Sequence, residues 1–404
     1  MNQTLQHSTV HSVTASWRRS LLIAAALTVG VRLFLTVYLA GADLLFPRPA
    51  ILHWLYDSTG VKILDSGWQG MLLGVWQRED VIWYQKIATV GYSARDMTVQ
   101  FFPLYPLLSG WLSRLTTLHP IAAGMLISDV SLIGALFLLH RLVLPEFGLG
   151  TADRTVVYIS LFPFAFFLHA PLTESLALAL IVLAFFLITR EHLLLALAAA
   201  YLVGLTRPQG MAFGIALSVQ YLAQRGALNL RILTTMTRQD LVRVAGITIA
   251  PLLGAATFAG VVNTPWRTPG VPATVGPMVQ QWLTIPGIPL LYSGQRILQG
   301  MAYPIDMSDF VLAVLFLLLA GVALVKLRPG YSIYAVLFVL LPLSRFSERF
   351  PLMSFSRYML LLFPCFVVLA LWGQRRWVHL TVVFLWLSGL AFWSAMYYTG
   401  SFVG

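Results

Sequence analysis

The residues best suited to chemistry in this chain lie in or beside long apolar runs. Asp80 follows Glu79 in the stretch "WQREDVIWYQKIATVGYS", among several aromatic residues. Glu174 opens an apolar run in "HAPLTESLAL", Arg207 separates two runs in "GLTRPQG", and Arg357 enters another in "SFSRYMLLLFP". A carboxylate in a partly desolvated cleft suits a general base, and the arginine fork suits phosphate. These residues predict a site with an acid, arginines and aromatic walls for a sugar ring or a lipid headgroup.

The acidic residues also have purely structural interpretations. Glu79 and Asp80 could form a solvated pair in a loop. Because adjacent residues do not share a helix face, we expect only one of the two to point into a cleft. Glu174 could be an N-terminal acid favoured by the helix dipole, with Thr173 as the cap.

The basic residues have structural interpretations too. Arg207 fits a loop arginine at a membrane interface, and Arg357 fits a side chain that runs along apolar surface to reach water. His169, in the apolar stretch before Glu174, is more often a hydrogen-bonded core histidine than a ligand. The sequence has no His and Cys cluster with metal-site spacing and no nucleotide-binding glycine motif, so we expect no metal and no cofactor.

The composition is that of a polytopic membrane protein. Of the 404 residues, 58% are hydrophobic and only 10% are charged, and the mean hydropathy is +0.80. A soluble domain carries about 25% charged residues. The formal net charge of +11 does not indicate nucleic-acid binding, because Lys and Arg collect in the cytoplasmic loops of membrane proteins. The single cysteine, Cys365, excludes a disulfide within the chain.

The apolar runs predict one all-α domain over residues 1–404, a transmembrane bundle of about 11–12 helices. We expect eleven full spans, and one irregular segment at 101–118, because "FFPLYPLL" carries two prolines near its start. Two long outer loops are expected at 46–100, with short juxtamembrane helices, and at 263–305. The runs are about 20–45, 101–118, 121–142, 154–171, 173–189, 192–206, 208–223, 243–262, 308–326, 331–344, 355–372 and 377–398.

The basic segments predict the orientation in the membrane. Arg18-Arg19 places the N-terminus on the cytoplasmic side. If 101–118 does not span the membrane, the later basic segments all lie on the cytoplasmic side, because two helices separate each of them from the next. These cytoplasmic segments are Arg141 to Arg154, Arg190 to His192, Arg225 to Arg243, Lys326 to Arg328, and Arg375-Arg376. The residues with candidate chemistry then converge on the outer side.

Four segments resemble the signatures of the PIG-V-type mannosyltransferases, in that family's order. "EDVIWYQKIATVGYS…QFFPLYPLL" is similar to a stretch that starts with Trp-Asp and ends Ile-Ala-x-x-Gly-Tyr, followed by Phe-Phe-Pro-x-x-Pro. The family's catalytic aspartate matches Asp80. Its tryptophan position is Glu79 here, and its second acid is Ile82, which disfavours a two-carboxylate or metal-dependent site. The other three segments are "FFLHAPLTESLALAL", "LTRPQG" and "SFSRYMLLLFPCF", in which the family's acid and two arginines match Glu174, Arg207 and Arg357.

The resemblance implies a GT-C type integral-membrane glycosyltransferase. It implies a polyprenyl- or dolichyl-phosphate sugar donor, usually mannose, and inversion at the anomeric carbon. It assigns catalysis to Asp80. The residues that it assigns to substrate binding are Glu79, Trp83, Tyr84, Gly91, Tyr92, Phe102, Pro103, His169, Glu174, Arg207, Arg357 and Tyr358.

Two alternatives remain open from the sequence. One is a transporter or flippase of a lipid-linked saccharide, which would more often show internal repeats, and none is visible. The other is a GT-C enzyme that uses another sugar. The expected partners are the bilayer, the lipid-phosphate sugar, a glycan, lipid or protein acceptor whose identity the sequence leaves open, and a partner subunit of the kind found with relatives. The expected location is a prokaryotic plasma membrane, or the endoplasmic reticulum membrane in a eukaryote.

Overall fold

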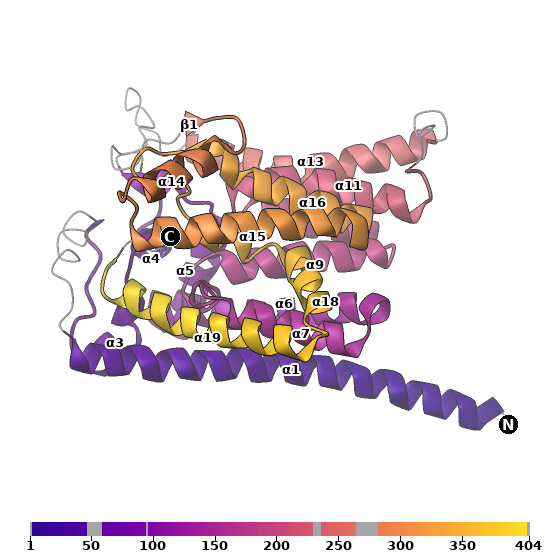
Figure 1. Ribbon diagram of the computed structural model, residues 1–404, viewed down its shortest axis with the longest axis horizontal. Coiled ribbons are helices and arrows are strands. Elements are labelled where there is room, and N and C mark those ends of the chain that lie inside the picture. Colours follow the sequence, from indigo (N-terminus) through magenta and orange to yellow (C-terminus); the bar gives the residue numbers. More distant parts are fainter. Residues whose placement is uncertain (1, 47–58, 94–95, 229–235, 264–281, 402–404) are drawn as a thin grey trace.

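The computed structural model describes residues 2–46, 59–93, 96–228, 236–263 and 282–401, which form a bundle of helices (Figure 1). The α-helices are, in chain order, α1 (Asn2–Leu45), α3 (Gly67–Leu72), α4 (Asp80–Thr89), α5 (Leu104–Thr116), α6 (Pro120–Phe147), α7 (Leu149–Leu161), α8 (Phe166–His169), α9 (Glu174–Thr189), α10 (Leu193–Gly204), α11 (Phe213–Gln224), α13 (Arg238–Asn263), α14 (Ile288–Leu298), α15 (Pro304–Lys326), α16 (Pro329–Leu340), α17 (Phe355–Met359), α18 (Phe363–Trp372) and α19 (Arg376–Tyr398). The 3₁₀ helices are η1 (Gly74–Trp76), η2 (Met97–Gln100), η3 (Pro208–Ala212) and η4 (Pro342–Ser344). Strands β1 (Trp282–Leu283) and β2 (Arg345–Phe346) form an antiparallel pair.

Five of the described helices are long and apolar enough to cross a membrane: most of α1, then α6, α13, α15 and α19. At 1.5 Å per residue, a helix of the length of α15 extends about 35 Å, against about 30 Å of bilayer hydrocarbon. Shorter apolar helices accompany them, among them α9, α10 and α18. The all-α class predicted from the sequence is thereby confirmed, and the length and composition of these five helices support the predicted membrane-protein class.

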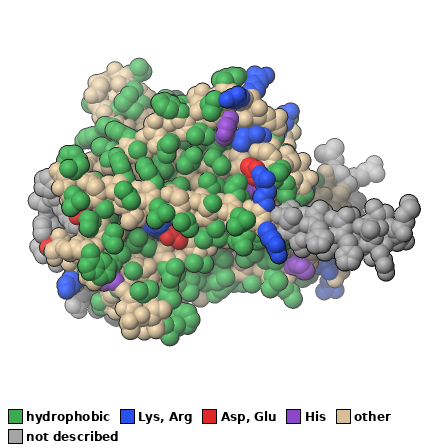
Figure 2. All heavy atoms as spheres, turned by 90° about the horizontal axis from the view of Figure 1, so that it is seen from below, with side chains coloured by type: hydrophobic (Ala, Val, Ile, Leu, Met, Phe, Trp, Pro, Cys, Tyr) green, Lys and Arg blue, Asp and Glu red, His purple; other side chains and the backbone are tan. Residues whose placement is uncertain are grey.

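The long helices run side by side along one axis (Figure 1). The N-terminal end of α1 lies at one end of the bundle, and α3, α4, α14 and β1 lie at the other. Figure 2 shows a largely hydrophobic face on which Lys and Arg gather toward the end where the N-terminal residues lie. This is the distribution expected if that end is cytoplasmic.

Several apolar runs are divided differently from the sequence prediction. Helix α1 begins at Asn2, well before the expected start near residue 20. The run 154–171 is not one helix, because α7 ends at Leu161, just before Pro163, and a residue that precedes proline avoids the helical region. The run 355–372 is divided into α17 and α18.

The predicted loops are described only in part. In the first, 46–100, the structure describes α3, η1, α4 and η2, while 47–58 and 94–95 lie outside the described residues. In the second, 263–305, residues 264–281 lie outside them, and β1 and α14 occupy the rest. The segment expected to be irregular contains α5, whose 13 residues extend only about 20 Å.

Helix α4 packs closely against α5. A Cβ atom on Gly110 of α5 would lie 2.5 Å from the carbonyl oxygen of Ala88 in α4, so only glycine permits this approach. The start of α5 is joined to the end of α10, because the Leu104 amide donates to the Leu205 carbonyl at 3.2 Å. These contacts fix α4, and with it Asp80, against the bundle.

Candidate active site

Asp80 is the first residue of α4, where the helix dipole favours a carboxylate. Glu79 before it has φ 43° and ψ −125°, a backbone conformation that is strained for a residue other than glycine. Such strain persists only where the surroundings fix it, and it is concentrated at functional sites. The Asp80 side chain is 37% exposed, so a ligand can reach its carboxylate.

Arg357 of α17 joins the two candidate acids. Its Nη1 donates to Asp80 Oδ2 at 2.6 Å, and its Nε donates to Glu174 Oε1. The guanidinium also lies 5.0 Å from the centroid of the Phe167 ring, and only 4% of the Arg357 side chain is exposed. The rigid fork of arginine suits this double contact, because separate N–H groups can reach two carboxylates at once.

Glu174, at the start of α9, is completely buried. Its Oε1 accepts a second hydrogen bond from Nη1 of Arg207 at 3.0 Å. Taking a carboxylate out of water costs several kcal/mol unless cations and donors surround it, and the two arginines meet that need. Its Oε2 is buried with no hydrogen-bond partner among the described residues. The predicted cap is wrong, because the Thr173 side chain makes no capping hydrogen bond.

Tyr358 links two arginines on the same side of the site. The Arg207 guanidinium lies 5.2 Å from the centroid of the Tyr358 ring, and Nη1 of Arg345 in β2 donates to the Tyr358 hydroxyl at 3.0 Å. We call Asp80, Glu174, Arg207, Arg345, Arg357 and Tyr358 the acid–arginine cluster. Its three guanidinium groups and two carboxylates give a formal charge of +1 (3 − 2), which favours an anionic ligand.

The aromatic residues of α4 pack beside this cluster in two ways. Tyr84 is buried edge-on against Phe101 and Tyr105, at centroid distances of 5.1 and 5.7 Å. Burial, together with the nearby carboxylates of the cluster, raises the pKa of its hydroxyl. Trp83 is half-buried; its ring stacks on Phe101 at 6.3 Å, and Lys86 Nζ lies 5.8 Å from its centroid. Of the two, Trp83 is the ring that a ligand could contact.

The turn after α4 is built by the other residues that the resemblance marks. Gly91 has φ 94°, which favours glycine. The Tyr92 hydroxyl donates to the Phe101 carbonyl at 2.8 Å, and the Phe102 ring lies 4.7 Å from that of Phe258 in α13. Pro103 precedes α5 as its N-cap. The described contacts of these residues shape the turn and do not reach the acid–arginine cluster.

An apolar groove of about 530 Å³ lies along α5. Its wall joins α5 to the end of α10 and to α13. The lining residues are Pro103, Leu104, Leu107, Leu108, Trp111, Leu205, Thr257 and Phe258. Leu205 precedes Arg207 by two residues, so the groove adjoins the segment that supplies one cation of the cluster.

An ion pair fixes the loop that follows α4. Lys86 Nζ lies 2.9 Å from Asp96 Oδ2, while Asp96 Oδ1 accepts from the amide and the hydroxyl of Thr98 at 2.9 and 2.6 Å. Burial alone would raise the pKa of Asp96, but the Thr98 bonds and Lys86 outweigh it and hold the pKa below its usual 3.8.

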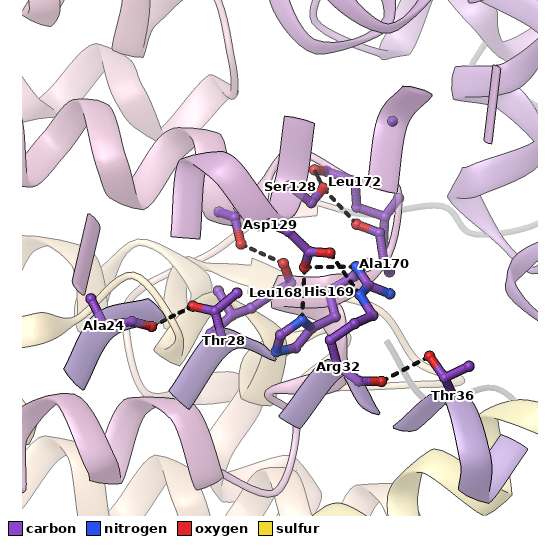
Figure 3. A network of polar contacts seen from close by, with 12 residues as sticks. Ala24, Thr28, Arg32, Thr36, Ser128, Asp129, Leu168, His169, Ala170 and Leu172 are labelled. Atoms are coloured by element: carbon purple, nitrogen blue, oxygen red, sulfur yellow. Dashed lines mark hydrogen bonds and ion pairs between the residues drawn. The ribbon is translucent and has the colours of Figure 1, made fainter. Parts of the chain in front are cut away.

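The described contacts place His169 in a second polar cluster (Figure 3). Its Nδ1 lies 3.0 Å from Asp129 Oδ1, and Arg32 donates from Nε and Nη2 to the two oxygens of Asp129 at 2.7 and 2.8 Å. Arg32 Nη2 also donates to the His169 carbonyl at 2.5 Å. We call Arg32, Asp129 and His169 the Arg32 cluster. A role for His169 in the acid–arginine cluster therefore has no support in these contacts.

Sequence reasoning missed Arg345, Arg32 and Asp129. Arg32 and Asp129 each stand alone in an apolar run, and a lone charge at such a position was the available signal. Arg345 had no comparable signal, because it lies in a polar segment with other arginines. Within the described residues, no group of three or more His, Cys, Asp or Glu could hold a metal ion.

No protein-family model matches the sequence, and a search of curated proteins found no significant match. The resemblance to the PIG-V-type mannosyltransferases therefore depends on the four short segments quoted above and on the contacts among their residues.

Proposed function

We propose that the chain is an inverting glycosyltransferase of the GT-C type that moves a sugar from a polyprenyl-phosphate donor to an acceptor hydroxyl. Mannose is the first candidate for the sugar. One observation carries the proposal. Asp80, Glu174, Arg207 and Arg357 come from the four segments that resemble the family, and their side chains form one connected set of hydrogen bonds. Four charged residues with unrelated roles would have no reason to meet in this way.

In the proposed reaction, Asp80 accepts the proton of the acceptor hydroxyl. The hydroxyl oxygen attacks the sugar C1 from the face opposite the phosphate, and the bond between C1 and the phosphate oxygen breaks. The electron pair leaves with the lipid phosphate, whose charge Arg207 and Arg357 stabilise. The formal charge of +1 on the acid–arginine cluster supports this assignment, because an arriving phosphate meets more positive than negative charge.

The apolar groove along α5 supports a lipid-linked donor. A polyprenyl chain is wholly hydrocarbon, and the groove offers it an apolar wall next to the Arg207 segment. Trp83, the partly exposed ring beside the cluster, could stack on the sugar or the acceptor. In this account the site faces the extracytoplasmic side, with the basic end of the bundle in the cytoplasm of a prokaryote.

A transporter or flippase of a lipid-linked saccharide is the second candidate. The Arg32 cluster favours it, because ionisable residues inside a membrane bundle often mark substrate or ion pathways. The two candidates differ in outcome. A transferase forms a new glycosidic bond, whereas a flippase changes only the leaflet in which the lipid lies.

The test uses the purified chain in lipid vesicles with radiolabelled polyprenyl-phosphate mannose and a crude membrane fraction as acceptor. The proposal predicts label in a new product, and no product when GDP-mannose replaces the lipid donor. If the label stays on the lipid while the lipid reaches the opposite leaflet, the chain is a flippase. Transfer from polyprenyl-phosphate glucose or arabinose, but not mannose, would keep the GT-C class and correct the sugar.

A further inference from the structure

Asp309 is a buried acid that the proposed reaction does not use. It is the sixth residue of α15 and is only 3% exposed. Ionisable residues in a candidate membrane span are costly, so they are usually paired or functional. Asp309 has a specific set of donors: its Oδ1 accepts from the backbone amide of Ser356 at 2.9 Å and from the Ser356 hydroxyl.

These donors lie in the first turn of α17. The first amides of a helix have no intrahelical acceptor, and the side chain of the N-cap residue normally supplies one to the second or third helical amide. In α17 the N-cap is Ser354, which has φ 62° and makes no side-chain cap bond. Ser356 is the second residue of α17. Asp309 therefore caps α17 from another helix, in place of Ser354.

The residue after Ser356 is Arg357. A five-residue helix has little stability of its own, and α17 must hold Arg357 so that its Nη1 reaches Asp80 and its Nε reaches Glu174. We propose that Asp309 is a positioning residue, which fixes the first turn of α17 and thereby aims Arg357 at the two carboxylates. Where the proposal concerns turnover, it rests on the proposed transferase function.

A matched control lies one turn earlier in the same helix. Asp306 is also 3% exposed, and its Oδ2 accepts from the Tyr303 amide at 2.9 Å and lies 3.8 Å from Arg296 Nη2. These two contacts stabilise the start of α15 and do not involve α17. Asp306→Ala should therefore lower the melting temperature without loss of turnover per folded molecule, whereas Asp309→Ala should lower both.

The experiment has one arm that needs no activity. Arg357 is 4% exposed, so an arginine-specific phenylglyoxal reagent should modify it slowly in the folded protein, with the exposed Arg349 as an internal reference. Peptide mass spectrometry measures both rates. We expect Asp309→Ala and Ser356→Ala to raise the rate at Arg357 several-fold relative to Arg349, and Ser356→Thr and Asp306→Ala to leave it unchanged.

The second arm measures turnover. Misplacing a catalytic group by about 1 Å can cost about 10²-fold in rate, so we expect that order of loss in Asp309→Ala, and rescue in Ser356→Thr relative to Ser356→Ala. In an Arg357→Lys background, Asp309→Ala should add little, because the two residues act as one unit. If Asp309→Ala fails to fold, Ser356→Ala is used for both measurements.

Unchanged reactivity of Arg357 in folded Asp309→Ala and Ser356→Ala would overturn the inference. So would a loss of turnover in Asp306→Ala equal to that in Asp309→Ala, or full additivity with Arg357→Lys. A wild-type chain with no transferase activity would instead refute the proposed function, and the reactivity arm would still decide the role of Asp309.

Discussion

Glu174 is completely buried, and its Oε1 accepts hydrogen bonds from both Arg357 and Arg207. Removing one member of a buried ion pair costs about 3–5 kcal/mol, because it leaves an uncompensated charge. We expect Glu174→Gln to lower the melting temperature in detergent, and Glu174→Gln/Arg207→Gln to recover part of the loss. A single variant as stable as the wild type, or a double variant less stable than the single, would contradict this electrostatic account.

Asp96 gives the loop after α4 a pH dependence. Its pKa in the folded chain lies below the usual 3.8, so its contribution to stability is present above about pH 4 and is lost as the pH falls through the lower, folded value. The melting temperature of the wild type should exceed that of Asp96→Asn at pH 6, and the difference should shrink toward pH 3. A difference that stays constant over this range would show that the Asp96 charge contributes nothing. The exposed Asp65→Asn is the control.

At the residue scale, the sequence identified five of the six members of the acid–arginine cluster, all but Arg345, because each of the five stands in a recognisable short segment. It could not pair them, since the partners are separated by up to 277 positions and meet only through helix packing. His169 illustrates the limit. It precedes Glu174 by only five residues, yet the turn between α8 and α9 directs it toward Arg32 and Asp129.

At the element scale, the contact between α4 and α5 depends on one glycine. A Cβ atom on Gly110 would meet the Ala88 carbonyl oxygen at 2.5 Å, while one on Gly134 of α6 would meet nothing within 4 Å. Overpacking costs about 1–3 kcal/mol, so Gly110→Ala should reduce thermal stability and displace α4 with Asp80. Gly134→Ala should be neutral or slightly stabilising, because alanine favours helix. Equal melting temperatures for the two variants would contradict the described packing.

The apolar runs located most of the helices, because a helix that lies in hydrocarbon must consist mainly of apolar residues, and such a run is visible in the sequence. The ends and breaks were harder to predict. Pro163 divides one expected run, and residues 2–19, although polar, continue α1 as helix. The polar part of a helix that extends beyond an apolar segment does not raise the local hydropathy, so the start of α1 could not be predicted from the hydropathy pattern.

At the scale of the whole molecule, the proposed orientation predicts that the two ends of the helix bundle lie on opposite sides of the membrane. Ser66 lies just before α3, and Gln374 lies just before α19, and both are exposed. The native Cys365 is buried and should not react. In intact cells, an impermeant maleimide should label Ser66→Cys but not Gln374→Cys, which should react only after lysis. The opposite pattern would reverse the orientation and place the acid–arginine cluster in the cytoplasm.

The most direct test of the central claim is the initial rate of sugar transfer from polyprenyl-phosphate mannose by Asp80→Asn, beside wild type and the loop control Asp65→Asn. General-base catalysis typically contributes about 10²–10⁴-fold, so the account predicts a loss of at least that order in Asp80→Asn, with wild-type rates in Asp65→Asn. The Asp80→Asn protein should remain folded, because the amide oxygen can still accept from Arg357. A near-normal rate in Asp80→Asn would contradict the account, since the acid that it places at the reacting hydroxyl would then be dispensable.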